Sequence, residues 1–122
     1  MSTELSISVV DDDDSFRLAI IGSLRSMGYA ATGFASGEEF FAAHESQSSH
    51  CVITDYHMPG MSGLELIRQL QVQGSTMPTI VITAHPEPGL ETAATALGAV
   101  GLLRKPFETD GLIQCLQKAL KT

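Results

Sequence analysis

The stretch CVITDYHMPGMSG, from Cys51 to Gly63, decides the fold of this chain. Its first residues are strand formers, and Pro59 with two glycines forces the chain to turn a few residues later. Asp55 lies between these two signals and is therefore predicted to stand at the end of a strand. In an open parallel α/β sheet this edge is where ligands bind, so the position of Asp55 favours a chemical role.

The same succession of strand and helix signals recurs along the whole chain. Short apolar segments predict strands over residues 5–10, 29–34, 51–54, 79–83 and 100–103. Helix caps or helical spacing follow each strand, from residues 13–15, 36, 62, 93 and 110 onward. Five such units imply right-handed crossovers. We therefore predict a doubly wound (βα)5 fold of the α/β class, a three-layer sandwich with a parallel sheet between two layers of helices.

Size and composition indicate one compact domain over residues 1–122. The chain is 43% hydrophobic, and its composition does not shift along its length. Its longest apolar runs are far shorter than a membrane span, and residues 1–8 lack the basic start and apolar block of a signal peptide. We therefore expect a cytoplasmic protein that does not bind a membrane. A formal charge of −7 argues against a nucleic-acid surface, which needs clustered Lys and Arg.

Five polar residues follow the predicted strands at one edge of the sheet: Asp11, Asp12, Asp55, Thr83 and Lys105. In a doubly wound sheet these strand ends can converge on one crevice. Three carboxylates brought together repel each other, so the arrangement is reasonable only if a cation neutralises them. Oxygen ligands without His or Cys at metal spacing favour Mg²⁺, which shares its waters readily with a phosphate.

Each of these residues also has an ordinary explanation. An acidic run before a helix often caps that helix, and we assign this role to Asp13 and Asp14. For Asp11 and Asp12, the run alone favours a cap and a metal ligand about equally. A threonine in a strand and a lysine near the surface are common without any chemistry. The order of all five residues at strand ends is what points to a site.

Four motifs stand at these strand ends: VVDDD at residues 9–13, TDYHMPGMSG at 54–63, VITA at 81–84 and RKPF at 104–107. Together they resemble the receiver domains of response regulators in two-component signalling, the CheY-like superfamily. The resemblance spans residues 7–120 and implies a flavodoxin-like sheet with strand order 2-1-3-4-5. The runs 58–63 and 105–107 look nearest to receivers that precede a helix-turn-helix DNA-binding domain.

The resemblance implies that Asp55 is the phosphoacceptor, which takes a phosphoryl group from the phosphohistidine of a sensor histidine kinase or phosphotransfer protein. It also implies Mg²⁺ bound by the side chains of Asp12 and Asp55 and by the backbone carbonyl of His57, with Asp11 acting through water. A loose phosphoryl-transfer transition state needs mainly positioning and charge neutralisation, and these roles would supply both.

Two further residues would contact the phosphoryl oxygens according to the same resemblance. Lys105 would act as a compact cation, and Thr83 would donate its hydroxyl. The resemblance also implies a cis peptide bond between Lys105 and Pro106, which the tertiary amide of proline makes accessible.

Four positions correspond to switch or tuning residues of the family: Leu102, His57, His85 and Ala84. The switch residue on the fifth strand is usually aromatic, so Leu102 is a departure, and we weigh a plain core or interface leucine equally. We predict weaker or differently built coupling from Asp55 to the face formed by the fourth helix, fifth strand and fifth helix. Histidines in exposed loops usually have no functional role, and this is the simpler interpretation of His57 and His85. The alternative is that one of them makes the lifetime of the phosphoryl group depend on pH.

The predicted function is a phosphorylation-controlled signalling switch. It would catalyse only its own phosphorylation and dephosphorylation, and would not be an enzyme for a separate substrate. The alternative is an aspartate-nucleophile phosphatase of the haloacid-dehalogenase type. Those enzymes carry a second Asp two residues after the nucleophile, where this chain has His57. We therefore rank the phosphatase far below the switch.

The expected partners are the kinase and either a downstream protein or a covalently attached output domain. Composition does not decide between a stand-alone receiver and the receiver of a longer regulator. We expect a monomer before phosphorylation. Leu90, Leu102 and Leu103 could make an apolar patch for dimerisation after phosphorylation, on the face of the fourth helix, fifth strand and fifth helix, although a few exposed leucines are normal.

Overall fold

The computed structural model describes residues 5–43, 48–85 and 87–120. Within these ranges five parallel strands form one sheet: β1 (Ser6–Val10), β2 (Ala30–Phe34), β3 (Cys51–Asp55), β4 (Thr79–Thr83) and β5 (Gly101–Arg104). Their order in the sheet is β2-β1-β3-β4-β5. The predicted strand order is therefore confirmed, and the predicted strand ends agree with the observed ones to within about one residue.

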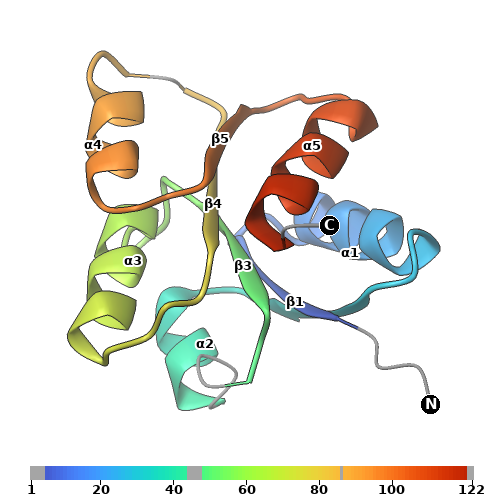
Figure 1. The fold of residues 1–122 in the computed structure, drawn as a ribbon, viewed down its shortest axis with the longest axis horizontal. Coiled ribbons are helices and arrows are strands. Elements are labelled where there is room, and N and C mark those ends of the chain that lie inside the picture. Colours follow the sequence, from blue (N-terminus) through green and yellow to red (C-terminus); the bar gives the residue numbers. More distant parts are fainter. Residues whose placement is uncertain (1–4, 44–47, 86, 121–122) are drawn as a thin grey trace.

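Within the same ranges five helices cover the sheet: α1 (Asp14–Ser26), α2 (Gly37–Ala42), α3 (Gly63–Val72), α4 (Leu90–Ala96) and α5 (Thr109–Leu120). Figure 1 shows α1 and α5 on one face and α2, α3 and α4 on the other. The predicted three-layer, doubly wound α/β fold is confirmed. Among residues 5–43, 48–85 and 87–120, no helical segment has the length and hydrophobicity that a membrane span requires.

The core lies on both faces of the central strands. Ile53 of β3 belongs to a cluster that contains Leu24 of α1 and Leu116 of α5. Its neighbour Val52 belongs to a cluster on the opposite face. Every residue of β3 and β4 is buried, because a parallel sheet covered by helices on both sides has no exposed face. Packing on both sides fixes the position of Asp55, the last residue of β3.

Polar caps begin three of the helices, as the sequence predicts. Asp13 precedes α1 and accepts a hydrogen bond from the N–H of Phe16 at 3.0 Å. Ser36 caps α2 in the same way. Before α3, Ser62 and Glu65 exchange hydrogen bonds in a capping box, with distances of 3.2 and 3.3 Å. The caps set where each helix leaves the C-terminal edge of the sheet, and they confirm Asp13 as a cap.

The apolar patch expected from Leu90, Leu102 and Leu103 is not one exposed surface. Leu90 is 4% exposed and belongs to the buried residues at the start of α4. Leu102 and Leu103 are partly buried in clusters on opposite faces of the sheet, because successive residues of a strand point to opposite sides. The prediction of one patch from these three leucines is therefore wrong, and the oligomeric state stays a prediction.

Gly63 marks a close approach between the start of α3 and the end of β3. A Cβ atom added at Gly63 would lie 2.5 Å from the carbonyl oxygen of Asp55 and 3.1 Å from Cα of Tyr56. Relief of that overlap requires a shift of the backbone that carries Asp55. We expect Gly63→Ala to lower the free energy of unfolding by about 2 kcal/mol or more, measured by urea denaturation.

Gly22→Ala is the matched control, because a Cβ atom at Gly22 in α1 meets nothing within 4 Å. Alanine is favoured over glycine inside a helix, so this variant should be neutral or gain up to about 1 kcal/mol. Equal stability of the two variants would contradict the close approach at Gly63.

Candidate functional site

The five polar residues predicted for the site all lie at the C-terminal edge of the sheet. Asp11 directly follows β1, and Asp55 ends the neighbouring strand β3. Thr83 ends β4, and Lys105 directly follows β5. Backbone hydrogen bonds continue the sheet past these ends. The N–H of Asp11 donates to the carbonyl of Phe34 at 3.0 Å, and that of Lys105 donates to the carbonyl of Thr83 at 2.7 Å.

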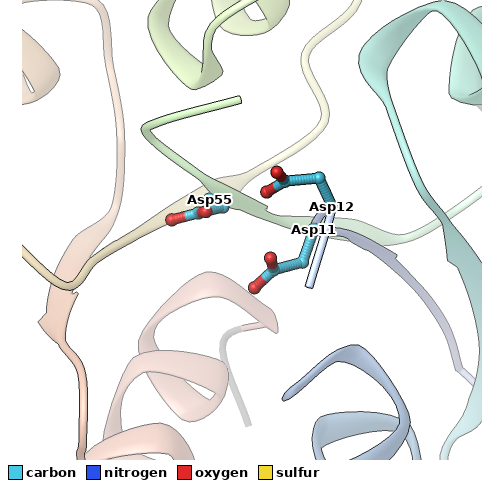
Figure 2. A group of neighbouring side chains, drawn as sticks. All are labelled: Asp11, Asp12 and Asp55. Atoms are coloured by element: carbon cyan, nitrogen blue, oxygen red, sulfur yellow. The ribbon is translucent and has the colours of Figure 1, made fainter. Parts of the chain in front are cut away.

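Asp11, Asp12 and Asp55 form one acidic cluster, shown in Figure 2. Each offers a carboxylate oxygen that lies within 4.8 Å of those of the other two. Asp11 is 1% exposed and Asp55 is 6% exposed, whereas Asp12 faces solvent. Carboxylates in a poorly solvated place repel each other more strongly than in water. The cluster therefore has a buried floor and an open side at Asp12.

Arg17 of α1 holds the turn that carries the acids, a role that sequence reasoning missed. Its Nη1 donates to the backbone carbonyl of Asp11 at 2.7 Å, and its Nη2 lies 2.7 Å from Oδ1 of Asp14. The N–H of Asp13 also donates to Oδ1 of Asp11 at 2.9 Å. The i,i+3 spacing of Asp14 and Arg17 predicts the ion pair, but spacing says nothing about the bond to the backbone of Asp11.

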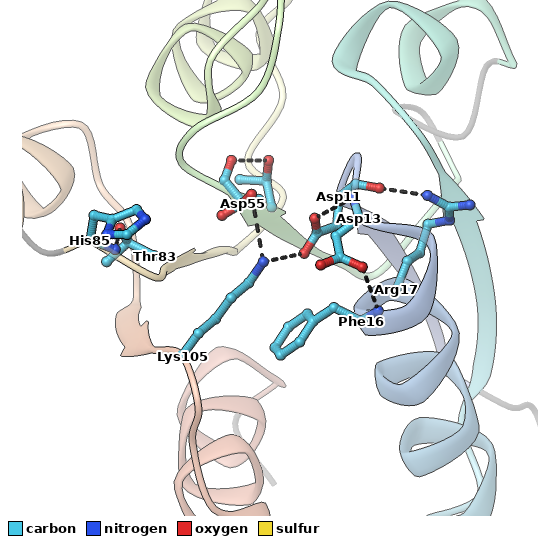
Figure 3. A network of polar contacts seen from close by, with 9 residues as sticks. Asp11, Asp13, Phe16, Arg17, Asp55, Thr83, His85 and Lys105 are labelled. Carbon is cyan, nitrogen blue, oxygen red and sulfur yellow. Dashed lines mark hydrogen bonds and ion pairs between the residues drawn. The ribbon is translucent and has the colours of Figure 1, made fainter.

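Lys105 brings a positive charge to the acidic cluster. Its Nζ lies 2.9 Å from Oδ2 of Asp11 and 3.6 Å from Oδ2 of Asp55, and Figure 3 shows both ion pairs. The Lys105 side chain is 14% exposed, so these contacts are less screened than a surface pair. One ammonium facing three carboxylates leaves a net negative charge. The peptide bond from Lys105 to Pro106 is cis, as the resemblance implies.

The pKa of Asp55 is raised from its ordinary 3.8 to about 6, mainly because burial disfavours the charged carboxylate. The negative charge of Asp11 contributes to this increase, and the nearby ammonium of Lys105 opposes it. Asp55 is therefore ionised at neutral pH in surroundings that disfavour its charge. A carboxylate in this state gains from any additional cation beside it.

The acidic cluster fits a hard divalent cation. Oδ2 of Asp11 is buried and has no hydrogen-bond partner in the described part of the chain. Nζ of Lys105 approaches this oxygen at ion-pair distance but not in hydrogen-bond geometry. A buried carboxylate oxygen in this condition can be satisfied by a metal ion or by its bound water. The three clustered ligand atoms are carboxylate oxygens, the type of ligand that Mg²⁺ prefers.

Thr83 and the two predicted tuning histidines lie on the β4 side of the acidic cluster. Thr83 is completely buried, and its Oγ1 accepts a hydrogen bond from the N–H of His85 at 3.1 Å. The exposed rings of His57 and His85 have centroids 6.2 Å apart. Nε2 of His57 also lies 3.3 Å from Oε1 of Glu87. The loops that follow β3 and β4 thus contact each other beside the site.

Leu102, the predicted switch position, is partly buried. It packs against a buried cluster made of Ile67 from α3, Val81 from β4 and Ala94 from α4. Its side chain therefore faces α3 and α4. Ala84, the remaining tuning position, is exposed directly after β4.

Comparison with known proteins decides the family. A family model described as the response regulator receiver domain matches residues 7–117. This chain belongs to that family. FixJ of Azorhizobium caulinodans, a transcriptional regulatory protein, is 38% identical to this receiver over 120 residues, which are 98% of this chain and 57% of FixJ. NtrC of Salmonella typhimurium, a DNA-binding transcriptional regulator, is 35% identical over 92% of this chain and 24% of NtrC.

Solved structures share the receiver fold. The chemotaxis protein CheY4 of Vibrio cholerae matches with a TM-score of 0.88 and 29% identity, over 97% of this chain and 100% of that one. The crystal structure of FixJ-N matches with a TM-score of 0.87 and 31% identity, over 98% and 96% of the two chains. The chain is thus a response regulator receiver domain, and neither the family nor these relatives support the phosphatase alternative.

The raised pKa of Asp55 makes stability depend on pH in the absence of divalent ions. A pKa that is higher in the folded state gives stability that is complete below about pH 4 and is lost as the pH rises through about 6. Asn cannot ionise, so Asp55→Asn should gain stability relative to the unsubstituted protein over this range, on the order of 2 kcal/mol by neutral pH. Urea denaturation in a chelating buffer at several pH values measures the difference.

Glu108→Gln removes one exposed carboxylate and serves as the control, for which the difference should stay nearly constant with pH. The same flat profile for Asp55→Asn would show that Asp55 is not held in a charge-disfavouring environment.

Proposed function

We propose that this receiver domain is a phosphorylation-controlled switch whose phosphoacceptor is Asp55. The position of Asp55 carries the proposal, because its carboxylate meets those of Asp11 and Asp12 within 4.8 Å and lies 3.6 Å from Nζ of Lys105. The donor would be the phosphohistidine of a sensor kinase or phosphotransfer protein. The bond from phosphorus to the imidazole nitrogen breaks as a bond from phosphorus to an Asp55 oxygen forms.

Mg²⁺ is the cofactor that we propose for this transfer. The side chains of Asp12 and Asp55 and the backbone carbonyl of His57 would hold it, and Asp11 would act through water. When bound, Mg²⁺ supplies charge neutralisation for the acids and the phosphoryl oxygens. Asp11 is suited to an indirect role because its carboxylate lies deepest in the cluster, at 1% exposure, and already accepts a hydrogen bond from the N–H of Asp13.

Lys105 and Thr83 would bind the phosphoryl oxygens. Lys105 is close enough to Asp55 for its ammonium to reach an oxygen of a group attached there. Thr83 accepts a hydrogen bond from the N–H of His85, which leaves its own hydroxyl hydrogen free to donate. The two residues come from neighbouring strands, so they would contact the phosphoryl group from one side of the site.

The domain over residues 1–122 would catalyse its own phosphorylation and hydrolysis and would not turn over a separate substrate. Its partners would be the kinase and a downstream protein or attached output domain. FixJ and NtrC are transcriptional regulators that extend well beyond the matched region, which supports an output outside this domain. The net charge of −7 supports the absence of a nucleic-acid surface here.

Leu102 and the histidines would control what phosphorylation changes and how long it lasts. We propose that, with Leu102 in place of an aromatic residue, the coupling from Asp55 to the α4, β5 and α5 face is weaker or differently built. A phosphorylated structure in which Leu102 changes its packing as Thr83 moves would contradict this. We also propose that His57 or His85 alters phosphoryl lifetime; unchanged dephosphorylation rates in His57→Ala and His85→Ala would end that proposal.

The direct test of the acceptor is phosphorylation by acetyl phosphate with Mg²⁺, followed by mass spectrometry of the intact protein and of its peptides. We expect one phosphoryl group on the peptide that contains Asp55. Asp55→Asn should lose the modification because its amide is not a nucleophile for this reaction, and a chelator should abolish it in the unsubstituted protein.

Asp110→Asn is the control, an exposed carboxylate in the first turn of α5 that should leave the yield unchanged. Full modification of Asp55→Asn would overturn the assignment of the acceptor.

A further inference from the structure

Lys105 is held by more than its two acidic partners. Its Nζ also lies 4.1 Å from the centroid of the Phe16 ring, in the first turn of α1. Figure 3 shows the lysine side chain with the acids at its end and the Phe16 ring beside it. The ammonium therefore has two kinds of neighbour, charged oxygens and an aromatic face. The face of an aromatic ring carries partial negative charge and attracts a cation within about 6 Å.

An aromatic ring at this position can hold the ammonium of Lys105 without two drawbacks that another carboxylate would have. A lysine has a long, flexible stem, and holding it in one place costs conformational entropy. A carboxylate at the position of Phe16 would compete with a phosphoryl oxygen for the ammonium and would repel the incoming group. A neutral ring attracts the ammonium without either effect. Its attraction also does not depend on whether Asp11 and Asp55 are neutralised by another cation.

The Phe16 ring is itself fixed in place. It meets the ring of Phe107 edge to face, with centroids 5.7 Å apart and planes at 77°. The N–H of Phe16 donates to the capping side chain of Asp13 at 3.0 Å, which anchors the residue at the start of α1. Phe16 also packs against the large core cluster on the α1 and α5 side. An anchored ring gives Lys105 a defined position relative to the acids.

We propose that Phe16 is a positioning residue that holds the ammonium of Lys105 over the acceptor and so speeds phosphorylation of Asp55. This inference rests on the proposed function of Asp55. It assigns to α1 a contribution to the chemistry beyond its acidic N-terminal turn. The competing explanation is that Phe16 only fills space between α1 and the segment after β5.

The first test replaces the ring. Phe16→Leu keeps an apolar side chain but removes the aromatic face, and we expect phosphorylation by acetyl phosphate at saturating Mg²⁺ to become about 3- to 10-fold slower, as loss of a partly desolvated cation–π contact predicts. Phe16→Tyr keeps the face and should restore a rate close to that of the unsubstituted protein. Thermal unfolding of each variant checks that the comparison is made on folded protein.

The second test asks whether the effect passes through Lys105. In a Lys105→Met background, Phe16→Leu should change the rate less than about twofold, because the cation that the ring attracts is gone. An equal slowing in both backgrounds would show that the ring acts only through packing and would overturn the proposal.

A third measurement does not need phosphorylation at all. In the protein without divalent ions, the Lys105 Cε methylene protons should resonate upfield, because the Nζ atom bonded to this methylene lies over the Phe16 ring, 4.1 Å from its centroid. Phe16→Leu should remove this shift and Phe16→Tyr should keep it. An unshifted Lys105 signal in the unsubstituted protein overturns the placement of the ring. If the shift is present but Asp55 takes up no phosphoryl group, the proposed function fails while the contact stands.

Discussion

The structure depends on holding three carboxylates together against their mutual repulsion. Asp11 follows β1 and Asp55 ends β3, and the positions of these neighbouring strands are set by a core packed on both faces of the sheet. The sheet cannot relax this repulsion without losing buried contacts, so burial and the charge of Asp11 together raise the pKa of Asp55. Lys105 offsets part of it, because its ammonium lies between the two strand ends. The remaining negative charge favours a further cation at the site.

The same constraint suggests how a change at Asp55 would affect the rest of the domain. Strand β3, which carries Asp55, pairs with β4, and β4 pairs with β5; the residues that would contact a phosphoryl group end or follow β4 and β5. Around the site, His57 and Glu87 join the loops after β3 and β4. The segments that lead to α4 and α5 therefore lie close to Asp55, where a change of charge on this residue would affect them directly. Leu102 packs on that route, against α3 and α4.

Much of this arrangement could be predicted from the sequence, because parallel topology brings the C-terminal ends of all the strands to one edge of the sheet. Once five strand–helix units are recognised, Asp11, Asp55, Thr83 and Lys105 must meet at one edge of the sheet, whatever the details of packing. Helix caps were equally predictable, since a cap needs only residues that are close in sequence. Ser62 and Glu65 illustrate this, because each makes the bond that its spacing suggests.

What could not be predicted depends on how side chains from distant segments meet. Arg17 reaches the backbone of Asp11, and Phe16 reaches the ammonium of Lys105, only because α1 is rotated to that angle on the sheet. Leu90 was expected at the surface, but it is buried at the start of α4. Hydrophobic spacing is ambiguous on a helix as short as α4, so the sequence does not tell which side of it faces the core.

The most direct test of Asp55 as the phosphoacceptor is a crystal structure of the protein with Mg²⁺ and beryllofluoride, which imitates a phosphoryl group on a carboxylate. We predict beryllium attached to an oxygen of Asp55, the metal among the three clustered carboxylates, and Nζ of Lys105 at hydrogen-bond distance from a fluorine. Beryllofluoride attached elsewhere, or Lys105 paired with Asp11 and out of reach of the bound group, would contradict this prediction.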